Sequence, residues 1–309
     1  IAPAADRRGA GGAATFAGLA GQLRPVFRPS HRSGNDVSGF SADWLQLREP
    51  ADAAARNPAL TEQLLAWRRQ QDALSVLDLG SGTGANPRFL APRLGGAQHW
   101  RLVEHDPALL AQGDALLRRW AAGQALALSW EWQAQDLARE RAWQDPSDVQ
   151  LVTASALLDL VSSAWLDRLA RRCRDWRAAV FIVLSYDGSI VWHPVLNGDE
   201  AVCARVNRHQ RGDKGFGPAL GPAAAPTLAV RLERWGYQVE LQPSPWRLGA
   251  AHGAVQMALL DGWVEAVRQL DPDADDWLAG WALTRRRLIE QGASQLRVGH
   301  WDLFARLPM

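Results

Sequence analysis

The sequence predicts an α/β fold of the doubly wound kind: a seven-stranded, mostly parallel sheet with helices on both faces, an antiparallel last strand and added cap helices. Three observations predict it. From about residue 38 onward, short apolar runs alternate with helical stripes, as in repeated β-α units. Residues 179–184 are continuously apolar, as in a strand buried on both faces. An earlier apolar run, residues 74–79, ends in closely spaced glycines, which is typical of a ligand-binding edge of such a sheet.

The first half of the chain predicts four strands with helices between them. A helix is expected near Pro87, because proline is tolerated in a first helical turn. In residues 126–133 leucines and tryptophans alternate with small or polar residues, which predicts a strand with one buried face. The expected strands are residues 74–79, 100–104, 126–133 and 149–153, and the expected helices lie near 87–94 and 109–120.

The second half predicts a strand at 179–184, preceded by a helix capped at Ser162 or Ser163. The alternation of strands and helices is then interrupted over residues 187–225. The glycine- and proline-rich part of this segment, at 211–218, predicts a functional or partly disordered loop. Further elements are expected as a helix at 228–235, a strand at 238–241, two helices at 255–270 and 277–288, and a last strand at 296–305.

Composition excludes several classes of function. The 309 residues include 47% hydrophobic and 22% charged residues, and no run approaches the roughly 18 apolar residues of a membrane-spanning helix. With 34 basic and 33 acidic residues, the net charge of +1 gives no overall field for nucleic acid. The two cysteines have no metal-ligand spacing, so no metal is expected and a reducing cytoplasm is the expected location.

The glycines that follow the first strand predict a ligand-binding crevice, because bare backbone lets a ligand approach closely. Gly80, Gly82 and Ala85 also satisfy the dinucleotide-binding pattern, so the glycines alone leave the cofactor open. Asp78 discriminates, since its carboxylate would repel a pyrophosphate and attract the amino group of a cationic sulfonium cofactor.

The segment Asp78-Leu79-Gly80-Ser81-Gly82-Thr83-Gly84 resembles motif I of the class I S-adenosylmethionine-dependent methyltransferases, and the resemblance extends over roughly residues 70–160. It implies a Rossmann-like fold, S-adenosyl-L-methionine as cofactor with S-adenosyl-L-homocysteine as product, and methyl transfer of the EC 2.1.1 type. The motif Asn-Pro-Pro-Tyr is absent after strand four, which argues against the branches that methylate amino groups of nucleic acids and glutamine. A small-molecule acceptor is therefore expected.

The resemblance also implies cofactor-binding residues. Glu104 ends the second strand, where the family's acid binds the ribose hydroxyls, and Asp136 with Leu137 matches the acid and apolar residue near the adenine. Residues 154–159 resemble the segment that flanks the transferring methyl group. The expected cofactor-binding residues are Asp78, Gly80, Ser81, Gly82, Gly84, Glu104, His105, Asp136, Leu137 and Ser155.

Candidates for the acceptor side are less closely tied to a motif. His193 and His209 are candidate bases because histidine titrates near neutral pH, and Tyr186 ends strand five, where acceptors are often contacted. A helix at residues 40–56 is expected to cover the cofactor. The expected substrate-binding residues are Trp44, Arg48, Leu158, Asp187 and Lys214.

The chain divides into a tail and one domain. Residues 1–37, rich in Ala, Gly, Arg and Pro, predict a flexible tail without the apolar core of a secretory signal. Within the domain at 38–309 the expected parts are lid helices at 38–70, a cofactor-binding half at 71–186, a substrate-loop insertion at 187–225 and a C-terminal half at 226–309, with a helical insertion at about 250–292.

Two other functions stay open. A non-catalytic S-adenosylmethionine-binding regulatory protein would use the same cofactor residues, and an NAD(P)-dependent oxidoreductase would use the same glycines. The sequence leaves open the acceptor, the methylated atom and the oligomeric state.

Overall fold

The computed structural model describes residues 41–139 and 148–308, and the predicted tail at 1–37 lies outside them. The strands are β1 (Ala73–Leu79), β2 (Ala97–Glu104), β3 (Leu128–Ala134), β4 (Leu151–Ser155), β5 (Ala179–His193), β6 (Gln238–Pro243), β7 (Trp246–Leu248) and β8 (Gln295–Arg306). The α-helices are α1 (Ala42–Ala55), α2 (Pro58–Arg68), α3 (Ala85–Leu94), α4 (Pro107–Ala121), α5 (Ser163–Trp176), α6 (Asp199–Gln210), α7 (Ala224–Arg234), α8 (Gly253–Leu270) and α9 (Asp275–Glu290).

The strands form one sheet in the order β3-β2-β1-β4-β5-β8-β6, and β7 also pairs with β8. The pairs β1·β2, β1·β4, β2·β3 and β4·β5 are parallel, whereas β8 runs antiparallel to β5, β6 and β7. The doubly wound fold with an antiparallel last strand is confirmed. The sheet has eight strands rather than seven, because β7 has only three residues and is too short to show a period in the sequence.

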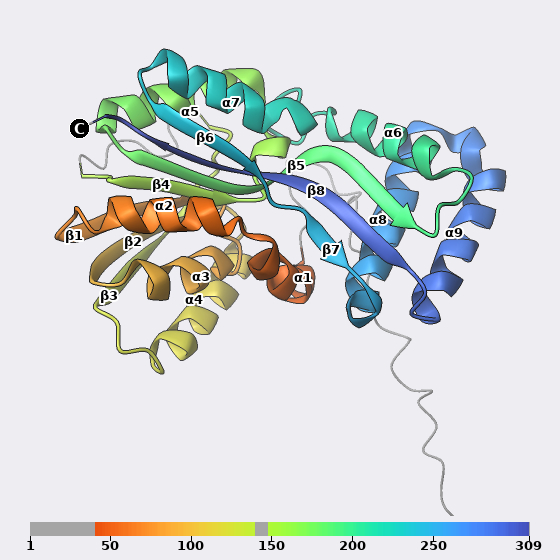
Figure 1. Ribbon diagram of the computed structural model, residues 1–309, viewed down its shortest axis with the longest axis horizontal. Coiled ribbons are helices and arrows are strands. Elements are labelled where there is room, and N and C mark those ends of the chain that lie inside the picture. Colours follow the sequence, from red (N-terminus) through yellow and green to blue (C-terminus); the bar gives the residue numbers. More distant parts are fainter. Residues whose placement is uncertain (1–40, 140–147, 309) are drawn as a thin grey trace, which may run out of the picture.

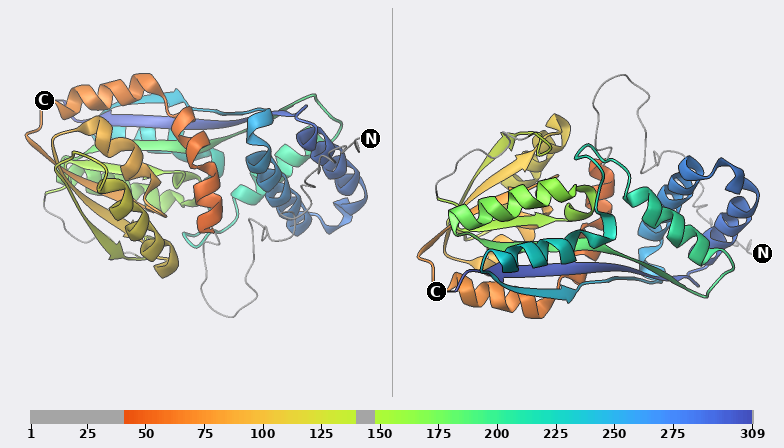
Figure 2. Two further views of the ribbon diagram at one scale, coloured as in Figure 1. Left: turned by 90° about the horizontal axis from the view of Figure 1, so that it is seen from below. Right: turned by 90° about the horizontal axis from the view of Figure 1, so that it is seen from above.

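Helices cover both faces of the sheet (Figures 1 and 2). On one face α2, α3 and α4 pack through leucines such as Leu60, Leu90 and Leu117. On the other face α5 and α7 pack through Trp165 and Leu228. The N-cap of α5 agrees with the predicted helix start, since Ser162 accepts from the backbone N–H of Trp165, and α4 is capped by Asp106, which accepts from the backbone N–H of Ala108.

A second hydrophobic cluster lies at the far end of β5 and β8, where α6, α8 and α9 gather (Figure 1). Trp192 of β5 lies at its centre, with its ring 5.3 Å from that of Trp263 and 5.5 Å from that of Trp281. Beside these rings the buried guanidinium of Arg285 pairs with Asp199. The two helices predicted between strands six and seven are therefore α8 and α9, and they pack on the sheet's extension.

The structure differs from the sequence prediction over residues 187–225. Instead of ending near Leu184, β5 continues to His193 with register shifts between Ile182 and Ser185 and between Tyr186 and Ile190. Helix α6 follows, and only residues 194–198 and 211–220 form connections without regular helix or strand. The β-bulges break the two-residue alternation that would otherwise have identified the strand.

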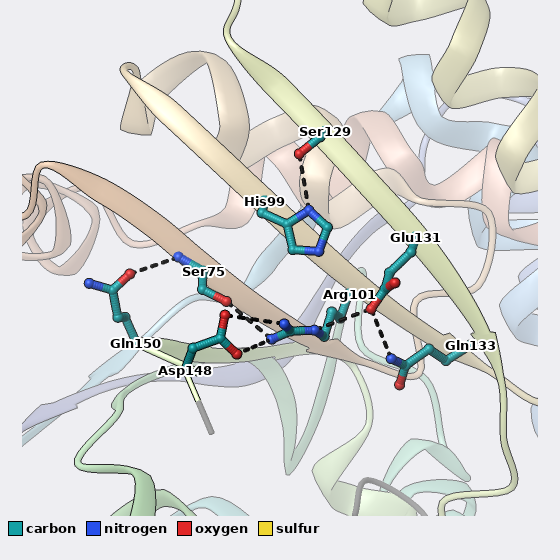
Figure 3. A network of polar contacts seen from close by, with 8 residues as sticks. All are labelled: Ser75, His99, Arg101, Ser129, Glu131, Gln133, Asp148 and Gln150. Atoms are coloured by element: carbon teal, nitrogen blue, oxygen red, sulfur yellow. Dashed lines mark hydrogen bonds and ion pairs between the residues drawn. The ribbon is translucent and has the colours of Figure 1, made fainter. Parts of the chain in front are cut away.

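The edge of the sheet at β3 is joined by a polar network (Figure 3). Arg101 of β2 pairs with Glu131 of β3 at 3.2 Å and with Asp148 at 2.8 Å, and it donates to Ser75 Oγ at 3.2 Å. Ser75 lies near the amino end of β1, Asp148 precedes β4, and Arg101 and Glu131 lie near the middle of β2 and β3, so the network does not reach the carboxyl ends. The charges therefore pair with one another across strands and stabilise the edge.

No helix in the described ranges is both long and apolar enough to cross a membrane.

Candidate functional site

A cavity of about 940 Å³ lies at the carboxyl ends of β1, β2, β3 and β4. In an open α/β sheet this is the edge where ligands bind. Helix α1 and residues 214–216 of the loop after α6 complete its wall. Of the sequence-predicted residues, those that line it are Arg48, Gly80, Ser81, Gly82, Glu104, His105, Asp136, Leu137, Ser155 and Lys214.

The glycine loop approaches its neighbours too closely for side chains. Gly80 and Gly82 have φ values of +66° and +54°, in the left-handed region. A Cβ at Gly82 would lie 3.0 Å from Leu45 Cδ1 of α1, and one at Gly80 would lie 3.3 Å from Leu157 Cδ1. Gly84 does not line the cavity; it is the N-cap of α3 with φ 76°. The loop thus presents bare backbone to the cavity.

Three backbone N–H groups of this loop already have partners inside the protein. Ser81 donates to Val103 O at 2.9 Å, Gly82 donates to Glu104 Oε2 at 2.9 Å, and Gly84 donates to Ser81 O at 2.8 Å. A phosphate-binding glycine loop uses such N–H groups to hold the anion. This loop offers a ligand close approach rather than a set of free donors.

Glu104 is a buried carboxylate at the cavity wall. Its Oε1 accepts from the backbone N–H groups of His105 and Asp106 at 2.8 and 2.9 Å, besides the bond from Gly82 to Oε2. Burial raises its pKa, but the hydrogen bonds from His105, Asp106 and Gly82 outweigh burial and hold the pKa below its ordinary value. The hydrogen bond to Glu104 raises the pKa of His105 in turn. Glu104 is therefore ionised at neutral pH and can accept further hydrogen bonds.

Asp78 lies behind the cavity rather than on its wall. Its Oδ1 accepts from Asn86 Nδ2 at 2.7 Å, and it is Asn86 that lines the cavity. Burial raises the pKa of Asp78 to about 6, against the lowering effects of the Asn86 hydrogen bond and the nearby charge of Arg56. Asp78 itself does not line the cavity, whereas its hydrogen-bond partner Asn86 does.

Arg56 links this buried group to the end of β4. The Arg56 guanidinium donates to Asn86 Oδ1 at 2.9 Å and to Ser155 Oγ at 3.3 Å. Burial lowers its pKa, and the charges of Asp302, Asp52 and Asp78 oppose that change. The side chains of Asn86 and Ser155 are held at the cavity by one buried cation.

The acid predicted after strand three is also in place. Asp136 lies on the cavity wall, where its Oδ1 accepts from the backbone N–H of Ala138 at 2.9 Å, and Leu137 beside it is buried. Asp136 also pairs with the exposed Arg139 at 3.4 Å. This part of the wall offers an apolar side chain next to a carboxylate.

Helix α1 brings Arg48 and Asp52 to the cavity, and the two form a bidentate ion pair with distances of 2.9 and 3.0 Å. Asp52 also accepts from Trp246 Nε1 at 3.1 Å, and the Arg48 guanidinium lies 4.9 Å from the Trp246 ring. The Arg48 charge is thus neutralised within the protein.

Several predicted residues do not line the cavity. His193 ends β5 and is exposed, Tyr186 is buried with its hydroxyl donating to Asn207 Oδ1 at 2.9 Å, and Asp187 accepts from the backbone of Ser189 in a β5 bulge. Trp44 and Leu158 are buried in hydrophobic clusters.

His209 is also away from the cavity wall. Its Nε2 lies 2.9 Å from Gln269 Oε1, and its Nδ1 lies 3.3 Å from Lys214 Nζ. Burial, followed by the charge of Lys214, lowers its pKa. Neither of the two predicted bases, His193 and His209, lines the cavity, nor does the third catalytic candidate, Tyr186.

Sequence reasoning missed Asn86, Arg56, Leu45, Asp52 and Phe216. No sequence motif identifies Asn86 or Arg56, because their contacts are with residues that lie elsewhere in the sequence. Leu45 and Asp52 lie one helical turn to either side of Arg48, so the predicted covering helix contained the signal for them.

No family model matches the chain, and no curated protein matches it. Among solved structures, the SAM-dependent methyltransferase from Geobacter sulfurreducens in complex with S-adenosyl-L-homocysteine has a TM-score of 0.43 and 17% identity, covering 87% of this chain and 99% of that one. The cyclopropane synthase MmaA2 from Mycobacterium tuberculosis has a TM-score of 0.45 and 11% identity, covering 86% and 94%. With TM-scores below 0.5, these likenesses carry no functional information, and function is inferred from the residues of this chain.

Proposed function

We propose that the chain is an S-adenosylmethionine-dependent methyltransferase that acts on a small-molecule acceptor in this cavity. The observation that carries the proposal is the bond from the Gly82 N–H to Glu104, together with the occupied N–H groups of Ser81 and Gly84. A loop in which three of the backbone donors are taken, beside an ionised carboxylate, suits a ligand with hydroxyl donors and positive charge. A pyrophosphate would find a negative charge where it needs donors.

The residues present fit the cofactor. Glu104 Oε2 can accept a hydrogen bond from a ribose hydroxyl, because only the Gly82 N–H occupies it, whereas Oε1 already accepts from two backbone N–H groups. Asp136 can accept from the amino group of an adenine while Leu137 lies against the ring. The bare backbone at Gly80 and Gly82 leaves room for the amino-acid part, with Asn86 and the charge of Asp78 behind it.

The cofactor, when bound, supplies an electrophilic methyl group on a sulfonium. The protein then has to exclude water and orient the acceptor, and orientation can contribute much of the rate of a displacement. Leu45 lies against Gly82, Leu157 lies against Gly80, and Phe216 adds an apolar wall. The proposal assigns no general base to His193, His209 or Tyr186.

Calorimetric titration with S-adenosylmethionine and S-adenosylhomocysteine tests the proposal, and a parallel fluorescence titration with NADH tests the oxidoreductase alternative. We expect binding of both sulfur nucleotides and none of NADH. A folded sample that binds NADH and neither sulfur nucleotide would refute the proposal.

The regulatory alternative differs in chemistry rather than in cofactor binding. Incubation with methyl-labelled S-adenosylmethionine and a broad acceptor panel should transfer label to an acceptor. Tight cofactor binding with no transfer to any acceptor would favour the non-catalytic reading.

A further inference from the structure

Lys214 is the only lysine in the chain: of the 34 lysine and arginine residues, all others are arginine. It is also half-buried and lines the cavity. The two cations differ physically, because an ammonium is a compact charge with three donors, whereas a guanidinium is a wide planar fork. The cavity thus has a cation at this position that differs chemically from every arginine in the chain.

Among the described residues, none provides a close counter-ion for the Lys214 ammonium. Within the described ranges no carboxylate lies within the 4.0 Å of an ion pair with its Nζ, whereas Arg48 and Arg139 on the same wall are paired with Asp52 and Asp136. Burial lowers the pKa of Lys214, and the more distant charge of Asp159 opposes that change. A half-buried cation without an adjacent anion is costly, and an anionic ligand would offset this cost.

The loop that carries Lys214 is fixed at both sides of it. Asp213 Oδ1 accepts from the backbone N–H groups of Gly215 and Gly217 at 2.7 and 3.1 Å. The ring of Phe216 packs edge-on against Trp165 with 5.8 Å between centroids. The position of the lysine backbone is therefore set by the fold.

The side chain of Lys214 is held by His209. Gln269 Oε1 accepts from His209 Nε2 at 2.9 Å, which leaves Nδ1 as the acceptor that faces Lys214 Nζ at 3.3 Å. A neutral imidazole can orient an ammonium without neutralising its charge. His209 thus acts on the cavity through Lys214.

We propose that the acceptor of this cavity carries an anionic group, a carboxylate or a phosphate, that pairs with the ammonium of Lys214, and that His209 is the positioning residue for that ammonium. That this ligand is the methyl acceptor rests on the proposed function, whereas the existence of an anion-binding site at Lys214 does not. The neighbouring wall of Leu157, Leu160 and Phe216 is apolar, so the acceptor has an apolar body beside its anionic group.

The experiment compares ligands of one shape and different charge. Benzoate, phenyl phosphate and benzamide are titrated calorimetrically into the full chain, with and without saturating S-adenosylhomocysteine. We expect at least one of the two anions to bind about tenfold or more tightly than benzamide. A stronger response to benzoate identifies a carboxylate, and a stronger response to phenyl phosphate identifies a phosphate. Equal affinity for all three, or no response to either anion, overturns the proposal.

Variants assign the effect to the residue. Lys214→Met keeps the length of the side chain and removes its charge, and it should abolish the preference for the anion. Arg211→Met removes an exposed charge three residues away that does not line the cavity, and the preference should persist. A Lys214→Met protein that keeps the preference overturns the proposal.

The positioning role of His209 is tested by a measurement that a purely structural role would not change. His209→Ala should weaken benzoate or phenyl phosphate binding without affecting benzamide binding, and His209→Gln, whose amide oxygen can accept from the ammonium, should restore it. Loss of all three ligands alike would contradict positioning. Titration with S-adenosylhomocysteine alone separates the proposed function from the anion site. A protein that fails to bind S-adenosylhomocysteine refutes the methyltransferase proposal, whereas the comparison of benzoate with benzamide still tests the anion site.

Discussion

The backbone N–H of Gly82 donates to the Glu104 carboxylate across 2.9 Å, and this bond ties the glycine loop after β1 to the end of β2. Its partners come from neighbouring parallel strands, so the sheet itself sets their distance. The bond orients the carboxylate and removes a donor that a phosphate would otherwise use. One contact therefore determines both the shape of the loop and its preference for ligands.

Glu104→Gln should weaken binding of S-adenosylmethionine by more than about tenfold. The amide has one acceptor oxygen, so its NH₂ group would face a backbone N–H that the carboxylate now accepts from, and an unmade buried bond costs about 1–3 kcal/mol. Calorimetry measures the change. Glu131→Gln, on the exposed edge strand β3, is the matched control and should bind as the wild type does; equal affinity in both variants would contradict the role of Glu104.

Gly82→Ala should lower both the free energy of unfolding and the cofactor affinity. The left-handed φ costs about 1–2 kcal/mol for a residue with a Cβ, and that Cβ would also lie 3.0 Å from Leu45 Cδ1. Gly236→Ala is the control, since Gly236 has φ +84° with nothing within 4 Å of an added Cβ. Urea unfolding should show a loss in both variants, and calorimetry a loss of binding only in Gly82→Ala. Unchanged affinity in Gly82→Ala would show that α1 can move away without consequence.

Asp78 should make stability fall as pH rises from about 4 to about 6. Its pKa is raised from 3.8 to about 6 in the folded protein, so the folded state binds more protons than the unfolded state within this window. The stabilisation is full below the unfolded pKa and is lost as pH rises through the folded value, with a total of roughly 3 kcal/mol. Asp78→Asn removes the pH-dependent contribution of this carboxyl to stability, so the difference in unfolding free energy between wild type and variant should change between pH 4 and pH 6. A constant difference from pH 4 to 7 would contradict the raised pKa.

Arg101→Ala should lower the free energy of unfolding by about 1 kcal/mol, because Arg101 joins β1, β2 and β3 but its two acidic partners, Glu131 and Asp148, are exposed. Arg118→Ala, which removes an exposed pair with Asp114 on α4, should change it by no more than a few tenths. Cofactor affinity should stay unchanged in both, since neither residue lines the cavity. Equal stability of the two variants would show that the network in Figure 3 adds nothing beyond a surface pair.

The sequence predicted the elements between residues 71 and 186 well because each of them carries its own signal. The buried strand before Gly80, the N-cap at Ser162 and the alternation around Trp130 are local features, and the carboxyl ends of parallel strands bring Glu104, Asp136 and Ser155 together.

The acceptor side could not be predicted in the same way. His193 was expected near the site because residues 187–225 were interpreted as a loop, but nine further residues of β5 carry it roughly 30 Å along the strand. Helix α6 was missed because only Asp199, Val202 and Val206 are buried along it, too few to show a helical stripe. Asn86 is held at the cavity by its hydrogen bonds with Arg56 and Asp78, and no residue spacing in the sequence predicts these bonds.

Strands β5 and β8 run side by side from the hydrophobic clusters of the sheet into the tryptophan-rich cluster beneath α8 and α9 (Figure 1). Unfolding of β5 and β8 at one end would weaken the pairing of these strands at the other end. The two regions should therefore lose structure in a single cooperative transition. Heating followed by tryptophan fluorescence, which reports both regions because six of the sixteen tryptophans belong to the distal cluster, and by far-ultraviolet circular dichroism, which reports the whole backbone, should then give coincident curves with a single step.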